Sequence, residues 1–177
     1  MSEFSYVYAK ALFDLAKEEN KTDLYFNELT EISKIIKENS DYLNLIDTPS
    51  LSLTERQGLI DEAFSSASVN IKSFIKILSE KKCGYLLLKC ISEFRKLYDE
   101  ENNIERVTVI SLVPLKEDQL ERLTNKLSSI LNKKVVPMVQ VDEKIIGGVI
   151  LKLKNAQYDG SIKNRLDTLC SQIKGNV

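Results

Sequence analysis

The stretch DEENNIERVTVISLVP, from Asp99 to Pro114, contains the change of pattern that decides the fold. Before it, apolar residues recur every three or four positions, which is the spacing of amphipathic helices. From residue 106 to residue 113 the side chains alternate with a period of two in a run rich in β-branched residues, which is typical of a strand. We therefore expect a domain boundary near residue 104, with one domain over residues 1–104 and a second over residues 105–177.

Before this boundary the apolar spacing predicts a bundle of six helices. Their patterned segments are about residues 3–19, 25–36, 42–46, 52–64, 71–78 and 85–98. The fourth helix is predicted to begin at Ser52 or at Thr54, because Glu55 and Gln57 follow them at the three-residue spacing of a capping box. Gly84 is expected to end the fifth helix in a left-handed conformation.

After the boundary the pattern predicts a small α/β domain with a short sheet and two helices. Its strands are expected at residues 106–113, 135–141 and 149–153, and its helices at residues 120–131 and 161–174. Pro137 cannot donate a backbone hydrogen bond, which favours an edge position or a bulge for the second strand. The expected fold class is α+β.

Composition excludes several classes of function. The formal net charge is −1 and the isoelectric point is about 5.7, so the chain has no general attraction for nucleic acid or for anionic lipid. Only a local basic patch remains compatible with this charge. The N-terminal residues do not have the pattern of a signal peptide, and no run of 18 apolar residues occurs, so we expect the protein to remain where it is made.

The residues that most often carry catalysis are scarce. The sequence has no histidine, which removes Ser-His-Asp and Cys-His catalysis and the commonest metal ligand. Three cysteines, Cys83, Cys90 and Cys170, match no zinc or redox spacing and are expected to be reduced, buried thiols. The alternative is a small intracellular enzyme that uses Cys83 or Cys90 as a nucleophile. Charged runs such as Glu18-Glu19 are interpreted as solvated surface.

Gly147 and Gly148 form the only Gly-Gly pair. A phosphate loop needs glycines between a strand and the helix that follows it, whereas this pair precedes a strand. We therefore expect no nucleotide or other cofactor, and we assign the pair to a tight entry into the strand or to a bulge. Asp159 or Ser161 is expected to cap the final helix, with Gly160 between them.

The first predicted helix has an unusually wide apolar arc. Phe4, Val7, Tyr8, Ala11, Leu12 and Leu15 follow the series of an amphipathic helix, while Tyr6 and Phe13 lie further round its circumference. The helix is therefore either buried on two sides of the bundle or exposed on one side for a partner helix.

The stretch DEKIIGGVILKLKNAQYDGSIKNRLDTL, residues 142–169, resembles the C-terminal signature of the delta subunit of bacterial F-type ATP synthases, relatives of the mitochondrial oligomycin-sensitivity-conferring protein. The matching positions are Gly147, Gly148, Asp159, Ser161, Arg165 and Leu166. The segment YAKALFDLA, Tyr8–Ala16, is similar to the opening helix of that family. The predicted order of six helices and a small α/β domain also matches, so the resemblance covers nearly the whole chain.

The resemblance implies a non-catalytic connector in the stator, which helps the complex resist torque during proton-driven ATP synthesis. Residues 1–104 would bind the catalytic head, and residues 105–177 would bind the C-terminal helices of the peripheral-stalk b subunits. The N-terminal helix of an alpha subunit would enter a groove at Tyr8, Ala11 and Ile77. Association with the cytoplasmic face of the bacterial plasma membrane would be peripheral, through the complex, with no nucleic acid, metal or cofactor.

Overall fold

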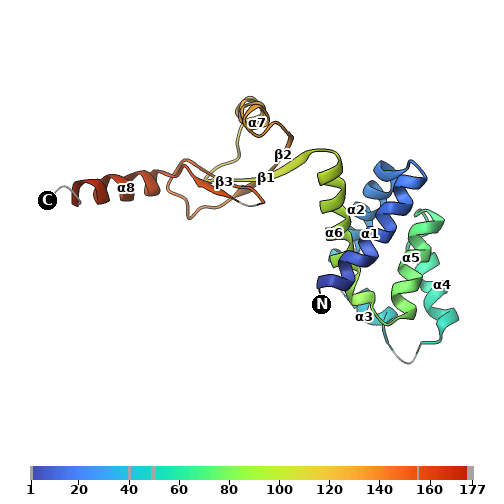
Figure 1. Cartoon of the computed structure of the whole chain (residues 1–177). Helices are drawn as coiled ribbons and strands as arrows, with labels where there is room; N and C mark the ends of the chain where they lie inside the picture. The colour runs from blue at the N-terminus through green and yellow to red at the C-terminus, as the bar shows by residue number, and fades with distance from the viewer. Residues whose placement is uncertain (1, 40, 49–50, 155, 175–177) are drawn as a thin grey trace. The chain divides into compact units, whose positions relative to one another are not determined.

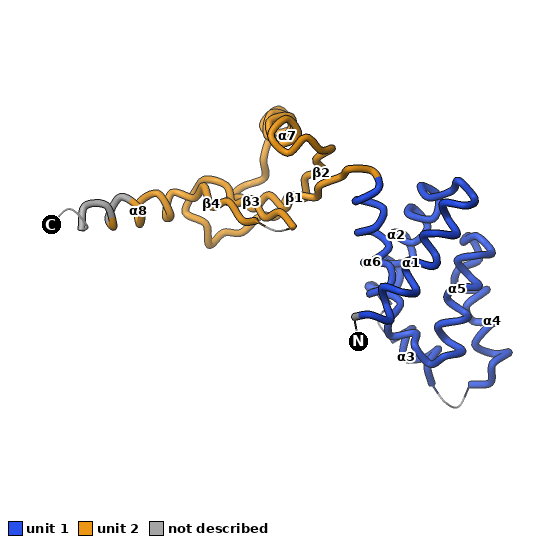
Figure 2. The backbone as a smooth tube through the Cα atoms, viewed as in Figure 1, with its two compact units in different colours: residues 1–101 blue, residues 102–177 orange. Residues whose placement is uncertain are grey.

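The chain forms a mixed helix-and-sheet structure of two compact units. The computed structural model describes residues 2–39, 41–48, 51–154 and 156–174. The units are Met1–Glu101 and Asn102–Val177, which we call unit 1 and unit 2 (Figure 2). All strands of the described residues lie in unit 2, whereas unit 1 is helical (Figure 1). The predicted mixed class of fold is therefore confirmed.

The elements of each unit follow one another along the chain in a fixed order. Unit 1 contains α1 Ser2–Glu18, α2 Thr22–Glu38, α3 Asp41–Ile46, α4 Leu53–Ala63, α5 Val69–Glu80, the 3-10 turn η1 Gly84–Leu86, and α6 Leu87–Glu101. Unit 2 contains β1 Ile104–Ser111, α7 Glu117–Leu131, β2 Lys134–Val141, β3 Val149–Lys152, β4 Gln157–Asp159 and α8 Ile162–Lys174.

The start of α4 is fixed by a capping box. The Ser52 hydroxyl accepts a hydrogen bond from the Glu55 backbone N–H at 3.3 Å, and the Ser52 N–H donates to the Glu55 carboxylate at 2.8 Å. Two backbone amides that have no partner inside the helix are satisfied in this way. Of the two predicted starts, Ser52 is confirmed and Thr54 is wrong.

The end of α5 differs from the prediction for Gly84. Lys82 is the residue that adopts the left-handed conformation, with φ of 53°, and Gly84 does not. Gly84 instead begins η1 and donates its N–H to the Asp47 carboxylate at 3.2 Å. A Cβ at position 84 would lie 2.7 Å from that carboxylate oxygen. The glycine is therefore explained by the close approach of a side chain rather than by backbone conformation.

One hydrophobic core holds unit 1 together. Its buried members come from all six α-helices and from η1, and they include Leu12, Tyr25, Ile46, Ile60, Ile75 and Phe94. The rings of Phe13 and Phe94 meet edge to face at 5.3 Å between centroids, which is a favourable arrangement of aromatic rings. The first and last helices of unit 1 are thus packed directly against each other.

The sheet of unit 2 has the strand order β2-β1-β3-β4. β1 and β2 are parallel and are connected through α7, whereas β1–β3 and β3–β4 are antiparallel. Pro137 lies in β2 at the edge of the sheet, so the edge alternative is confirmed. β4 was not predicted, because a strand of three exposed residues has no hydrophobic period.

The core of unit 2 is much smaller than that of unit 1. Val107, Val109 and Val135 are buried on the sheet, and partly buried leucines, including Leu123 and Leu127 of α7, pack against them. α7 has no fully buried residue. Much apolar surface of unit 2 is therefore left accessible.

Candidate docking surface

α1 presents different side chains to the protein and to water. Ser5, Ala9, Leu12, Phe13 and Ala16 form its buried face. The exposed face carries Phe4, Val7, Ala11 and Leu15, with exposed fractions of 66% for Phe4 and 63% for Val7. Most of the apolar series expected from the sequence therefore faces outward. Of the two alternatives for the wide arc, burial on both sides of α1 is wrong.

The size of the buried side chains explains which face of α1 is covered. Ser5, Ala9 and Ala16 are small and are nearly inaccessible to water. Small residues allow two helices to approach closely, and Phe13 then reaches Phe94 of α6 across the contact. The larger apolar residues at Phe4 and Val7 remain outside this contact. The close packing of α1 on α6 thus leaves the opposite stripe of α1 exposed.

α5 also has an apolar residue outside the core. Ile71, Phe74, Ile75 and Leu78 are buried, whereas Ile77 is 48% exposed. The three residues predicted for the groove therefore lie in one unit: Tyr8 is half-buried against the core, and Ala11 and Ile77 are exposed. We call the exposed stripe of α1 together with Ile77 the α1–α5 surface.

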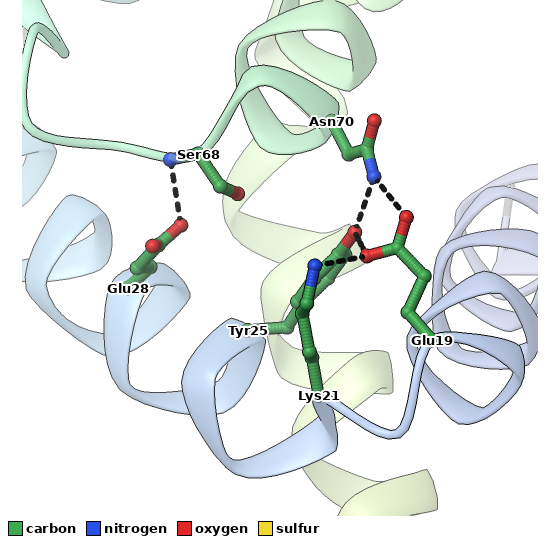
Figure 3. Close-up of polar contacts among 6 residues, drawn as sticks. All are labelled: Glu19, Lys21, Tyr25, Glu28, Ser68 and Asn70. Carbon is green, nitrogen blue, oxygen red and sulfur yellow. Dashed lines mark hydrogen bonds and ion pairs between the residues drawn. The ribbon is translucent and has the colours of Figure 1, made fainter.

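Polar contacts connect the end of α1 to the start of α5. Figure 3 shows Tyr25 of α2 and Asn70 of α5 converging on the carboxylate of Glu19. The Asn70 amide donates to both Glu19 and the Tyr25 hydroxyl at 2.7 Å, and that hydroxyl donates to Glu19 at 3.0 Å. Lys21 adds an ion pair to the same carboxylate at 3.3 Å. We call these four residues the Glu19 cluster, and it fixes α5 relative to α1 and α2.

The sequence analysis does not predict the Glu19 cluster, because it interprets Glu18-Glu19 as solvated surface. The half-buried Glu19 has hydrogen-bond partners on two other helices, so that interpretation is wrong for Glu19. The hydrogen bond from Tyr25 contributes most to lowering the pKa of Glu19. Loss of solvent opposes it more strongly than either Lys21 or Asn70 assists it, but all the hydrogen bonds together keep the pKa below its ordinary value. No local pattern in the sequence predicts this cluster, because Glu19 and Asn70 are 51 residues apart.

A second set of predicted residues shapes the start of α8. Gly148 has φ of 85°, and a Cβ there would overlap the Gly160 carbonyl and lie 2.9 Å from the Ser161 Cα. Asp159 accepts a hydrogen bond from the Ser161 N–H at 2.9 Å, and the Ser161 hydroxyl accepts one from the Asn164 N–H at 3.2 Å. Hydrogen bonds from Ser161 hold the pKa of Asp159 below its usual value. These contacts are architectural: they shape the turn that leads from β4 into α8.

Cys83 and Cys90, the two cysteines proposed as a nucleophile, do not have the environment of one. Burial raises the pKa of Cys90 to about 11, so its thiol is protonated at neutral pH. The Cys83 thiol is half-buried and donates to the Lys81 carbonyl at 3.3 Å. The side chain of Cys170 lies outside the described residues. The alternative of a cysteine enzyme has no support.

The described residues contain neither a membrane-spanning helix nor a cluster of metal ligands. None of the helices in these parts of the chain is long and apolar enough to cross a membrane. Residues 2–39, 41–48, 51–154 and 156–174 contain no group of three cysteine, aspartate or glutamate side chains that could hold a metal ion.

Comparison with known proteins gives a consistent answer. Residues 5–173 match the family described as "ATP synthase delta (OSCP) subunit". The ATP synthase subunit delta of Clostridioides difficile (strain 630) is 36% identical over 164 residues, which cover 92% of this chain and 91% of the relative. The protein of the same name from Moorella thermoacetica is 32% identical over 167 residues, with 94% of both chains covered.

A solved structure supports the fold. A chain of the Toxoplasma gondii mitochondrial ATP synthase hexamer matches with a TM-score of 0.75 over 96% of both chains, at 18% identity. The sequence match extends across both units and the structural match covers the same length. The chain therefore belongs to the ATP synthase delta (OSCP) subunit family and is a structural, non-catalytic component of the F-type ATP synthase stator.

Proposed function

We propose that the chain connects the catalytic head of the synthase to its peripheral stalk, with one unit for each partner. α1 to α6 act as one six-helix bundle, and their α1–α5 surface receives the amphipathic N-terminal helix of an alpha subunit. Unit 2 holds the C-terminal helices of the b subunits. The membrane is reached only through the complex, at the cytoplasmic face of the bacterial plasma membrane.

The observation that carries this proposal is the exposed apolar stripe of α1. Phe4 and Val7 leave more than half of their side-chain surface in water, although the same helix buries a complete second face. An exposed apolar stripe on a packed helix is favourable only when a partner covers it, and an amphipathic helix is the element that fits beside another helix. Ile77 adds an apolar contact from α5.

A connector of this kind needs binding strength rather than chemistry. Rotary catalysis applies torque to the head, so a stator component must hold both ends firmly. Helix-in-groove binding takes most of its energy from a few apolar anchors, each contributing on the order of 1 to 4 kcal/mol. Phe4, Val7, Ala11 and Ile77 are the proposed anchors on this chain.

The test is Ala11→Asp in the full chain, with affinity measured for a peptide that copies the alpha-subunit N-terminus. A carboxylate on the contact would be desolvated without a counter-charge, so we expect at least a tenfold loss of affinity, or about 1.4 kcal/mol. Because Ala11 is exposed, the helical circular dichroism signal should be unchanged.

The matched control is Ala63→Asp, which places the same charge at an exposed alanine of α4. It should leave peptide affinity within about twofold. Lys152→Asp in unit 2 should also have no effect. Unchanged binding by Ala11→Asp would show that the alpha-subunit helix docks elsewhere on the bundle.

A further inference from the structure

Unit 1 has a concave region between α2, α3 and α4. Its volume is about 810 Å³, which lies within the range of about 300 to 1,000 Å³ that is usual for pockets holding small organic molecules. Its described lining shares no residue with the α1–α5 surface or the Glu19 cluster. We call it the α3 pocket, and its lining includes Ile35, Ile36, Glu38, Asp41, Leu45 and Phe64.

The buried part of the lining is apolar. Ile36 and Phe64 are 1% and 2% exposed. The rings of Phe64 and Tyr42, which also lines the pocket, meet edge to face at 5.6 Å between centroids. Beside these residues, Ile35 and Leu45 are 45% and 46% exposed. An apolar group placed in the α3 pocket would remove the surfaces of both side chains from water, which is favourable.

The charged side chains of the described lining are all acidic. Glu38 and Asp41 are both exposed, and neither forms an ion pair with a lysine or arginine among the described residues. Burial raises the pKa of Tyr42 to about 12, so its hydroxyl is neutral at pH 7, and it donates to the Leu59 carbonyl at 3.1 Å. The described lining therefore has two carboxylates and no cation to balance them.

The ends of two helices add to this negative potential. α2 ends at Glu38 and α4 ends immediately before Phe64, so the C-terminal end of each helix contributes to the lining. Aligned peptide dipoles give a helix C-terminus a partial charge of about −0.5. α3 begins at Asp41, whose carboxylate offsets the partial positive charge at the start of that short helix. Side chains and backbone thus both favour a cation in the α3 pocket.

We infer that the α3 pocket binds a small amphipathic cation, with an apolar body about the size of a phenylalkyl group and one ammonium or guanidinium head. The body would cover Ile35, Leu45 and Phe64, and the head would lie beside Glu38 and Asp41. A partner helix of several turns fits less well, because the lining consists of helix ends and of a six-residue helix about 9 Å long. This inference does not rest on the proposed function.

The experiment is an NMR titration of the full chain with phenylbutylamine. Phenylbutanol and phenylbutyrate serve as neutral and anionic probes with the same apolar body. We expect the amine to shift the amide signals of residues 35–39 and 41–48 and to saturate with a Kd on the order of 1 mM. The alcohol should bind at least about fivefold more weakly, and the carboxylate should not saturate. Raising the salt concentration should weaken binding of the amine alone.

One variant tests the charged part of the α3 pocket. Glu38→Gln with Asp41→Asn should bind the amine at least about fivefold more weakly and should bind the alcohol as the wild type does. The control is Glu31→Gln with Asp118→Asn, which changes an exposed glutamate of α2 and an exposed aspartate in the first turn of α7. It makes the same change in net charge and should alter amine affinity less than about twofold.

A second variant tests the apolar part of the α3 pocket. Leu45→Ala should weaken binding of the amine and of the alcohol alike, by at least about threefold, because it removes apolar contact and no charge. Leu24→Ala is the control, at a leucine of α2 that is also 46% exposed and lies outside the described lining. It should change neither affinity by more than about twofold. Both variants should keep the helical circular dichroism signal, since the changed side chains are exposed.

Three results would overturn the inference. The first is an amine titration with no saturable shifts of residues 35–39 and 41–48 at about ten times the expected Kd. The second is equal binding of the amine and the alcohol, or full retention of amine binding by the Glu38→Gln, Asp41→Asn variant, because the pocket would then have no preference for a cation. The third is displacement of the amine by a peptide that copies the alpha-subunit N-terminus, with shifts of the same residues, which would identify a helix as the occupant.

Discussion

Gly148 is the position where a single side-chain atom would be most disruptive. Its φ of 85° lies in the region that favours glycine, and the Gly160 carbonyl occupies the space that a Cβ would need. Both obstacles are backbone features, so no rotation of a flexible side chain can relieve them. The tight connection between β3, β4 and the first turn of α8 therefore depends on the absence of a side chain at this position.

We predict that Gly148→Ala destabilises unit 2 by at least about 2 kcal/mol, because it adds an unfavourable φ to a steric overlap. Gly58→Ala is the matched control, since Gly58 lies inside α4 and a Cβ there would meet nothing within 4 Å. That change should stabilise the chain by about 0.5 to 1 kcal/mol. Urea unfolding followed by circular dichroism checks both values, and equal effects of the two substitutions would contradict the prediction.

Among the helices and strands, the sequence predicted type and order better than orientation. The change of period near Asp99–Pro114 located the start of the sheet, because periods of 3.6 and 2 are local properties. The buried face of α1 was not predictable in the same way. Its apolar residues occur on both faces of the helix. The buried face is the one with the small residues Ser5, Ala9 and Ala16, because it packs against α6. Since α6 lies some 80 residues later in the chain, no local sequence pattern predicts this contact.

The groove residues illustrate the same limit. Periodicity marked Ile77 as lying off the buried face of α5, and its exposure agrees with that pattern. Only the family resemblance distinguishes Tyr8 and Ala11 as groove residues, since periodicity alone places them with Leu12 in one stripe. The Glu19 cluster could not be predicted from the sequence, because hydrogen bonds between residues far apart in the chain produce no periodic pattern.

The Glu19 cluster predicts how the attachment of α5 depends on pH. The pKa of Glu19 is lowered from about 4.5 in the folded chain, chiefly by the hydrogen bond from Tyr25. A lowered folded pKa means that the stabilisation is present above about pH 4.5 and is lost as the pH falls through the folded value. Glu19→Gln should therefore be less stable than wild type at pH 7, and the difference should shrink by pH 3.

Urea unfolding of both proteins at pH 7 and pH 3 measures this effect. Glu18→Gln is the control, because it removes the same charge from an exposed neighbour that has no such hydrogen bonds to α2 or α5 among the described residues. A difference between Glu19→Gln and wild type that stays constant across this range would exclude an ionised Glu19 as the source of the stabilisation.

Each unit has its own hydrophobic core, which bears on how the chain can be divided. Every buried member of the unit 1 core lies between Ala9 and Phe94. We predict that residues 1–104 expressed alone form a helical domain that melts cooperatively, because no core residue is lost by the cut. Thermal melting by circular dichroism checks this, and a fragment with no transition would show that unit 2 is needed for unit 1 to fold.

The packing of α1 on α6 has a consequence for synthesis. The ribosome synthesises α1 first and α6 last among the helices of unit 1. About 80 further residues are therefore added before α6, which covers the buried face of α1, is complete. At about 5 to 20 residues per second, Leu12 and Phe13 remain uncovered for several seconds in every nascent chain. During that interval the growing polypeptide has two apolar faces on its first helix, and chaperones have their best opportunity to bind it.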